Sequence, residues 1–117
     1  MGSFNSEVDE VEDYDESSEV LIVDDDQLNM EAMRMMLQQF KLSASCVRSG
    51  PDALKLVQNR LSRADLKLYS LILLDYSMPV MNGFQCVQEI KELIQKHQNH
   101  TLMAVDQPLI YCVTAYR

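Results

Sequence analysis

Four short apolar runs alternate with three longer amphipathic stretches along the 117 residues of the chain. The apolar runs cover residues 19–24, 44–47, 71–75 and 108–114. Continuous apolar runs of this length between turn residues are typical of strands that are buried on both faces. Strands that alternate with helices form a parallel sheet with helices on both faces. The sequence therefore predicts an α/β fold, a doubly wound parallel sheet in the order β-α-β-α-β-α-β, within one domain.

The stretch 27–40 has the apolar spacing of a helix that buries one face. Its apolar residues recur three and four positions apart, and the expected buried face comprises Met33, Met36, Leu37 and Phe40. Asp26 directly precedes this stretch. Because a carboxylate at that position can accept hydrogen bonds from the first backbone amides, we expect Asp26 to cap the helix.

Two further helices are predicted, over residues 52–60 and 84–97. Pro51 lies at an early position of the first, where the missing N–H of proline is tolerated. The expected buried residues of this helix are Ala53, Leu54, Leu56 and Val57. In the last predicted strand, Tyr111 alternates with core positions, so we expect it to pack in the core.

Negative charge is concentrated at the start of the chain. Eight of the 18 acidic residues lie in positions 1–19, which contain no Lys or Arg, so the remainder is neutral. Such a segment cannot bury enough apolar surface to offset its ordering entropy, and we expect residues 1–18 to be a disordered tail or linker that precedes a domain of residues 19–117. No basic face is present, so binding to nucleic acid through charge is not expected.

The three cysteines, Cys46, Cys86 and Cys112, are far apart and lie inside apolar patterns. They lack the spacing of a metal site, and their odd number argues against a disulfide framework. We therefore expect buried, reduced thiols in a cytoplasmic protein. No apolar run approaches the roughly 18 residues of a membrane span, so this segment is not expected to contact a membrane.

Carboxylates and a hydroxyl lie at the ends of the predicted strands. Asp24 and Asp25 follow the first strand, Asp75 ends the third, and Thr114 ends the fourth. In a parallel sheet these ends share one edge, where such sheets bind ligands. Clustered carboxylates raise one another's pKa unless a cation joins them, and an all-oxygen site suits Mg²⁺. One carboxylate oxygen could then attack phosphorus, while the Thr114 hydroxyl could bind the phosphoryl oxygens.

With VLIVDDDQLN, LILLDYSMPVMNGFQCVQEI and PLIYCVTA, residues 19–117 resemble the receiver domain of two-component response regulators, particularly the type found in hybrid histidine kinases. The resemblance implies a flavodoxin-like fold with strand order 2-1-3-4. It also implies a phosphoacceptor, Asp75, rather than an enzyme with a separate substrate. Mg²⁺ would be held by Asp24, Asp25, Asp75 and the backbone carbonyl of Ser77. The phosphoryl donor would be a His on a histidine kinase or a His-containing phosphotransfer protein.

The same resemblance assigns roles to residues around the acceptor. Thr114 and Ala115 would form the switch that senses the phosphoryl group. Ser77 and Tyr116 occupy positions that tune how long this group lasts. Three residues would shape the loop after the acceptor: Met78, Pro79 and Gly83.

One departure from the family pattern leaves alternatives open. The pattern continues with another helix, a fifth strand that ends in a Lys, and a last helix, none of which can be assigned here. The chain could be a fragment, or it could complete its fold as a homodimer by swapping or edge pairing. It could also be a phosphorylation-silent binding module. A phosphatase that uses Asp24 and Asp26 is a third function, but it leaves Asp75 without a role.

Overall fold

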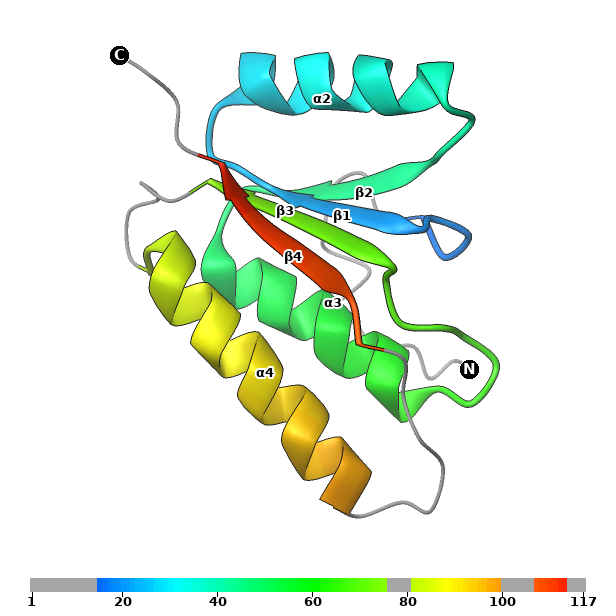
Figure 1. The fold of residues 1–117 in the computed structure, drawn as a ribbon, viewed down its shortest axis with the longest axis vertical. Coiled ribbons are helices and arrows are strands. Elements are labelled where there is room, and N and C mark those ends of the chain that lie inside the picture. The colour runs from blue at the N-terminus through cyan, green and yellow to red at the C-terminus, as the bar shows by residue number, and fades with distance from the viewer. Residues whose placement is uncertain (1–14, 76–80, 100–106, 114–117) are drawn as a thin grey trace, which may run out of the picture.

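The computed structural model describes residues 15–75, 81–99 and 107–113, and these form a parallel sheet between two layers of helix (Figure 1). The sheet has four strands in the order β2-β1-β3-β4. The elements are β1 Val20–Val23, α2 Gln27–Gln39, β2 Ala44–Val47, α3 Gly50–Ser62, β3 Leu71–Asp75, α4 Gly83–Asn99 and β4 Leu109–Val113. The predicted fold class, element order and strand order are confirmed.

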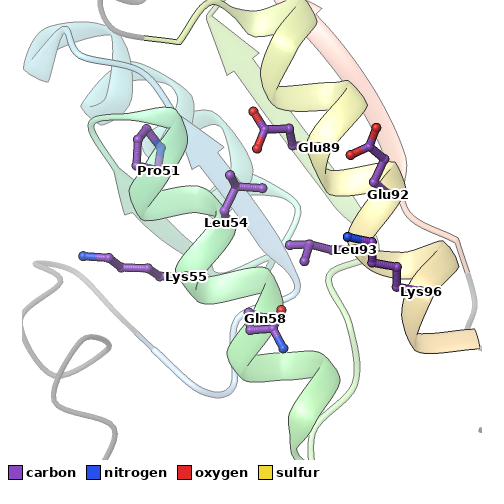
Figure 2. Close-up of a pocket in the computed structure, with 8 residues that line it drawn as sticks. All are labelled: Pro51, Leu54, Lys55, Gln58, Glu89, Glu92, Leu93 and Lys96. Carbon is purple, nitrogen blue, oxygen red and sulfur yellow. The ribbon is translucent and has the colours of Figure 1, made fainter. Parts of the chain in front are cut away.

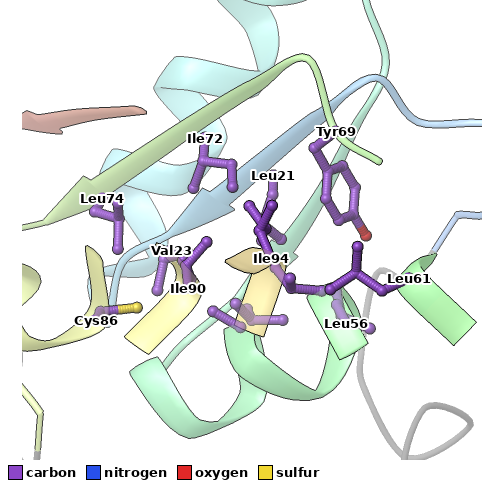
Figure 3. Close-up of a cluster of buried hydrophobic side chains, with 13 residues drawn as sticks. Leu21, Val23, Leu56, Leu61, Tyr69, Ile72, Leu74, Cys86, Ile90 and Ile94 are labelled. Carbon is purple, nitrogen blue, oxygen red and sulfur yellow. The ribbon is translucent and has the colours of Figure 1, made fainter. Parts of the chain in front are cut away.

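The central strand β1 is buried along its whole length, because helices cover both faces of the sheet (Figure 1). Successive side chains of a strand point to opposite faces, so β1 contributes to two cores. Leu21 and Val23 belong to the core under α3 and α4, together with Ile72 and Leu74 of β3 (Figure 3). Val20 and Ile22 face α2.

The predicted buried face of α2 is wrong in part. Only Met30 of this helix is buried, and Met33 and Leu37 are partly buried against the same core. Met36 and Phe40 are 56% and 70% exposed. Positions 30, 33 and 37 form a single stripe at helical spacing, and that stripe faces the sheet while the flanking apolar residues do not.

The helix α3 is longer than predicted at both ends. Ser49 caps it, because its hydroxyl accepts a hydrogen bond from the Asp52 N–H at 3.3 Å. Gly50 therefore belongs to the first turn, and Pro51 lies at an early helical position, as predicted. Of the expected buried residues, Leu54 is only partly buried. The helix α4 likewise extends by one or two residues beyond the predicted bounds.

Residues 15–18 were assigned to the acidic tail, but in the structure they pack against the domain. The Ser18 side chain is 2% exposed, and its Oγ lies 2.7 Å from Ser45 Oγ and 3.1 Å from a guanidinium nitrogen of Arg60. The Asp15 carbonyl oxygen also accepts a hydrogen bond from Arg60, at 3.1 Å. Arg60 binds this segment partly through backbone atoms, the carbonyl oxygens of Asp15 and Ser18. Amino-acid composition gives no information about contacts of this kind.

Two expectations for β4 are also wrong. Cys46 and Cys86 are buried as expected, but Cys112 is exposed. Tyr111 is 57% exposed and does not pack in the core. Both residues lie on β4, the last strand of the described sheet, where Leu109 is exposed as well. Among the helices of the described ranges, none combines the length and apolar character needed to cross a bilayer.

Candidate functional site

Three carboxylates meet at the carboxyl edge of the sheet. Asp24, Asp25 and Asp75 each offer an oxygen, and these oxygens all lie within 4.8 Å of one another. The pairing of β1 with β3 brings them together, because Val23 is in register with Leu74. Asp24 and Asp75 are each 3% exposed, whereas Asp25 is exposed to solvent. The predicted convergence of these three residues is therefore observed.

The three consecutive aspartates 24–26 have three different surroundings. Asp24 continues the sheet, since its N–H donates to the Val47 carbonyl at 3.0 Å. Its Oδ1 accepts a hydrogen bond from the Asp26 N–H at 2.9 Å, which turns the chain away from the sheet. Asp26 caps α2, as predicted, by accepting from the N–H of Leu28 at 2.9 Å. Asp25, between them, remains open to solvent.

The carboxyl of Asp24 has a pKa raised above its ordinary value. Burial is the main cause, because it disfavours the charged form. The negative charges of Asp75 and Asp25 raise the pKa further, while the hydrogen bond from the Asp26 backbone lowers it. A cation at the cluster would remove this repulsion. The donors are all carboxylate oxygens and one is open to water, a set that suits a hard divalent ion such as Mg²⁺.

A reciprocal cap begins the helix that follows the acceptor strand. The Gln85 N–H donates to Asn82 Oδ1 at 2.9 Å, and the Asn82 N–H donates to Gln85 Oε1 at 3.2 Å. This is a capping box, and it places the buried Gly83 in the first turn of α4. The spacing N-x-x-Q could have revealed it in the sequence, since a capping residue followed three positions later by Gln marks a helix start.

A groove lies between α3 and α4 (Figure 2), and none of the three clustered carboxylates lines it. Leu54 and Leu93 approach each other across it, and charged side chains form its rim. It is lined by Pro51, Leu54, Lys55, Gln58, Glu89, Glu92, Leu93 and Lys96. Because its carboxylates and ammonium groups are mixed, it has no single charge to select a ligand. The acidic cluster remains the better candidate for chemistry.

Comparison with known proteins identifies the family. Residues 20–114 match the sequence model of the response regulator receiver domain. The chain belongs to this family. The receiver domain is 36% identical over 77 residues to hybrid signal transduction histidine kinase L of Dictyostelium discoideum, covering 66% of this chain and 4% of that protein. It is 37% identical over 78 residues to the autoinducer 1 sensor kinase/phosphatase LuxN of Vibrio harveyi, covering 67% and 8%. The receiver domain thus spans less than a tenth of these relatives.

Solved receiver domains share its fold. The receiver domain of the histidine kinase CKI1 from Arabidopsis thaliana, complexed with Mg²⁺ and BeF₃⁻, superposes with a TM-score of 0.72 at 24% identity, covering 84% of this chain and 66% of that one. A receiver domain from Methylobacillus flagellatus superposes with a TM-score of 0.63 at 22% identity, covering 85% and 70%.

Several predicted site residues of the receiver domain lie outside the described residues. They are Ser77, Met78, Pro79, Thr114, Ala115 and Tyr116. Their proposed roles in metal binding, switching, tuning and loop shape therefore stay predictions. Gly83 is the one member of the loop-shaping set that the structure describes, at the start of α4.

Proposed function

We propose that this receiver domain accepts a phosphoryl group on Asp75. The observation that carries the proposal is the position of Asp75, which is buried at the carboxyl edge of the sheet with Asp24 and Asp25 within 4.8 Å. Membership of the receiver family supports it, and most of the relatives compared are histidine kinases. In the reaction, a carboxylate oxygen of Asp75 forms a bond to phosphorus as the bond from phosphorus to a donor histidine breaks.

The carboxylates fit a divalent cation. Asp24 and Asp75 would supply buried oxygens, and Asp25 would supply one that is reached from water. Mg²⁺ would neutralise the cluster and screen the phosphoryl oxygens from its negative charge. A fold neighbour, the CKI1 receiver domain, is known with Mg²⁺ and BeF₃⁻ bound, which supports the assignment. The Ser77 carbonyl would complete the protein ligands, as the family resemblance implies.

The remaining assignments are part of the same proposal. Thr114 and Ala115 would respond to the phosphoryl group, and Ser77 and Tyr116 would tune its lifetime. The donor would be a histidine kinase or a His-containing phosphotransfer protein, in the cytoplasm. We also propose a homodimer through the β4 edge, which the exposed side chains of Leu109 and Tyr111 support. A monomer in sedimentation that unfolds cooperatively would contradict it.

The structure disfavours the phosphatase alternative. That reaction needs Asp26 as an acid beside Asp24, but the Asp26 carboxylate accepts hydrogen bonds from the backbone N–H groups of Leu28 and Asn29. The Asp26 carboxylate is thus used to cap α2, and a phosphatase would also leave Asp75 without a role.

The test is phosphorylation by acetyl phosphate in the presence of Mg²⁺, followed by intact-protein mass spectrometry. We expect one phosphoryl group on the wild-type chain and none on Asp75→Asn. Asp52→Asn is the matched control, because Asp52 is not one of the three clustered carboxylates and lies instead beside Lys55. This variant should label like wild type. A folded wild-type chain that never labels would instead favour the silent binding module.

Mg²⁺ binding is measured separately, by titration calorimetry without a phosphodonor. Asp25→Ala should weaken binding at least about tenfold, because it removes one of the three carboxylate ligands. Unchanged affinity in this variant would show that the ligand assignment is wrong.

A further inference from the structure

Gly50 and Met81 make an unusually close approach at the carboxyl edge of the sheet. A Cβ atom at position 50 would lie 2.6 Å from Met81 Sδ and 3.0 Å from both its Cβ and Cγ. Gly50 begins α3, which follows β2, and Met81 directly precedes the cap of α4, which follows β3. The contact therefore joins two connections that leave the same edge of the sheet.

Space, not backbone conformation, explains a glycine at this position. In the described residues no glycine has a positive φ, so the backbone of Gly50 would accept any L-residue. Alanine within a helix is ordinarily more stable than glycine by roughly 0.5–1 kcal/mol. An alanine at position 50 should therefore be favourable unless the contact with Met81 matters.

We propose that the Gly50–Met81 contact fixes the position of Met81 relative to Asp75 and thereby sets the affinity of the acidic cluster for Mg²⁺ and the rate of phosphoryl transfer to Asp75. Gly50 and Met81 act as positioning residues, since neither offers a ligand. The inference rests on the proposed function of the cluster.

Met81 is held on two further sides. Its side chain packs against the core formed by the sheet, α3 and α4. The residue after it, Asn82, is fixed by the capping box with Gln85. Only five residues separate Asp75, which is paired in β3, from Met81. A shift of Met81 therefore changes the span that this short connection must bridge.

Gly50 cannot easily move to relieve a clash. Ser49 caps α3, and its carbonyl accepts a hydrogen bond from the Ala53 N–H at 3.1 Å. Ala53 is fully buried in the core. The sulfur of Met81 could rotate away from an added methyl, but its Cβ follows the backbone. The Met81 backbone must therefore shift by a few tenths of an ångström when a methyl group is added at position 50.

The test is a double-mutant cycle of Gly50→Ala and Met81→Gly, read by Mg²⁺ affinity and by the rate of labelling with acetyl phosphate. Gly50→Ala should lower both by about three- to tenfold, because small displacements of a binding group have effects of this order. In Gly50→Ala/Met81→Gly the contacts with Met81 Sδ, Cγ and Cβ are all gone. Both readouts should then return to within about twofold of Met81→Gly alone.

Gln58→Ala is the matched control, because it adds an alanine to the exposed side of the same helix. It should leave both readouts unchanged. Circular dichroism and urea unfolding establish that each variant is folded. If Gly50→Ala fails to fold, recovery of folding and Mg²⁺ binding in the double variant would support the same contact, and failure of the double variant would overturn it.

Two outcomes separate this inference from the proposed function. A wild-type chain that binds Mg²⁺ and labels, with a folded Gly50→Ala that does so equally well, overturns the inference alone. The inference is also overturned if the fold-changes in the double variant equal the product of the fold-changes in the two single variants. A folded wild-type chain that neither binds Mg²⁺ nor labels overturns the proposed function, and the inference with it.

Discussion

Buried charged side chains have opposite kinds of neighbours at the two ends of the sheet. At the carboxyl edge, Asp24 and Asp75 lie buried together with Asp25 close by, three groups of the same charge. At the amino edge, Arg60 is 4% exposed, and oxygen atoms accept hydrogen bonds from its guanidinium. It donates to the carbonyls of residues 15, 18 and 67 and to the Ser18 hydroxyl.

This difference separates a site that stabilises the fold from one that we propose to bind a cation. Arg60 also lies 4.0 Å from the centre of the Tyr69 ring, where a cation is attracted to the aromatic face. Its burial is compensated within the chain, by groups that are present in every state of the folded protein. At the other edge, burial and the neighbouring carboxylates raise the pKa of Asp24, and in the proposed function a bound cation would relieve the repulsion among the carboxylates and lower their free energy.

The largest predicted effect is at the amino edge. Arg60→Met keeps much of the side-chain volume but leaves the carbonyls of Ser18 and Lys67 without their donor. The loss of a charged hydrogen-bond donor from buried carbonyl groups strongly destabilises a folded protein. We therefore expect the free energy of unfolding to fall by about 3 kcal/mol. Urea unfolding followed by circular dichroism measures this change. Mg²⁺ affinity should stay close to the wild-type value, since Arg60 lies at the opposite end of the strands.

Arg63 provides the matched control. It lies three residues further along, and it pairs with Glu16 at 2.6 Å and Asp65 at 2.7 Å near the surface. Because ion pairs in contact with water add little to stability, Arg63→Met should change unfolding far less than Arg60→Met. Equal losses from the two substitutions would mean that the burial of Arg60 is not what matters.

The second prediction concerns Asp24 and pH. Its pKa is raised in the folded protein, so its contribution to stability is present below the ordinary value of 3.8 and is lost as pH rises through the raised pKa. Without Mg²⁺, Asp24→Asn should therefore raise the free energy of unfolding at pH 7 by about 1 kcal/mol, because it removes a buried charge that repels Asp75.

The advantage of this variant should shrink as the pH is lowered from 7 toward 4, because the raised pKa means that Asp24 gains its proton before an ordinary carboxyl does. Saturating Mg²⁺ should reverse the order at pH 7, because only the wild-type cluster gains free energy from the cation. Urea unfolding at the two pH values, with and without Mg²⁺, measures both effects. A wild-type chain that is the more stable of the two at pH 7 in a chelator would contradict the account of the cluster.

The carboxyl edge could be predicted from the sequence, and the amino edge could not. The apolar runs that end in Asp24 and Asp75 identify both the strands and the edge at which they meet. Arg60, in contrast, resembles any basic residue near the end of a helix. Its partners include backbone carbonyls of residues 15 and 18, in a segment whose composition suggests disorder. The contact of Gly50 with Met81 was missed for a similar reason, because it joins residues 31 positions apart.

The third prediction separates neighbours within the carboxyl edge. Asp26→Ala removes the cap of α2 and should lower the free energy of unfolding by about 1 kcal/mol. Asp25→Ala, one position earlier, removes an exposed carboxylate and should not destabilise the protein in the absence of Mg²⁺. Urea unfolding of the two variants in a chelator makes the comparison. If Asp25→Ala proved the more destabilising, the division between a capping aspartate and a binding aspartate would be wrong.

The last prediction concerns the rates at which two cysteines are alkylated, and it requires no change in the stability of the wild-type protein. Burial raises the pKa of the Cys86 thiol to about 12, with a further contribution from the negative charge of Glu89, so almost no thiolate forms at pH 8. Cys112 lies exposed on β4, and it should be alkylated by iodoacetamide in the folded protein. Cys86 should react only when the core opens. In Arg60→Met its labelling should accelerate by the same factor as the equilibrium constant for unfolding rises, provided that Cys86 is exposed only by unfolding. Peptide mass mapping over time distinguishes the two thiols.

Labelling of Cys86 as fast as Cys112 in the wild-type chain would show that the core under α4 is open. Arg60 would then stabilise less of the fold than its contacts indicate.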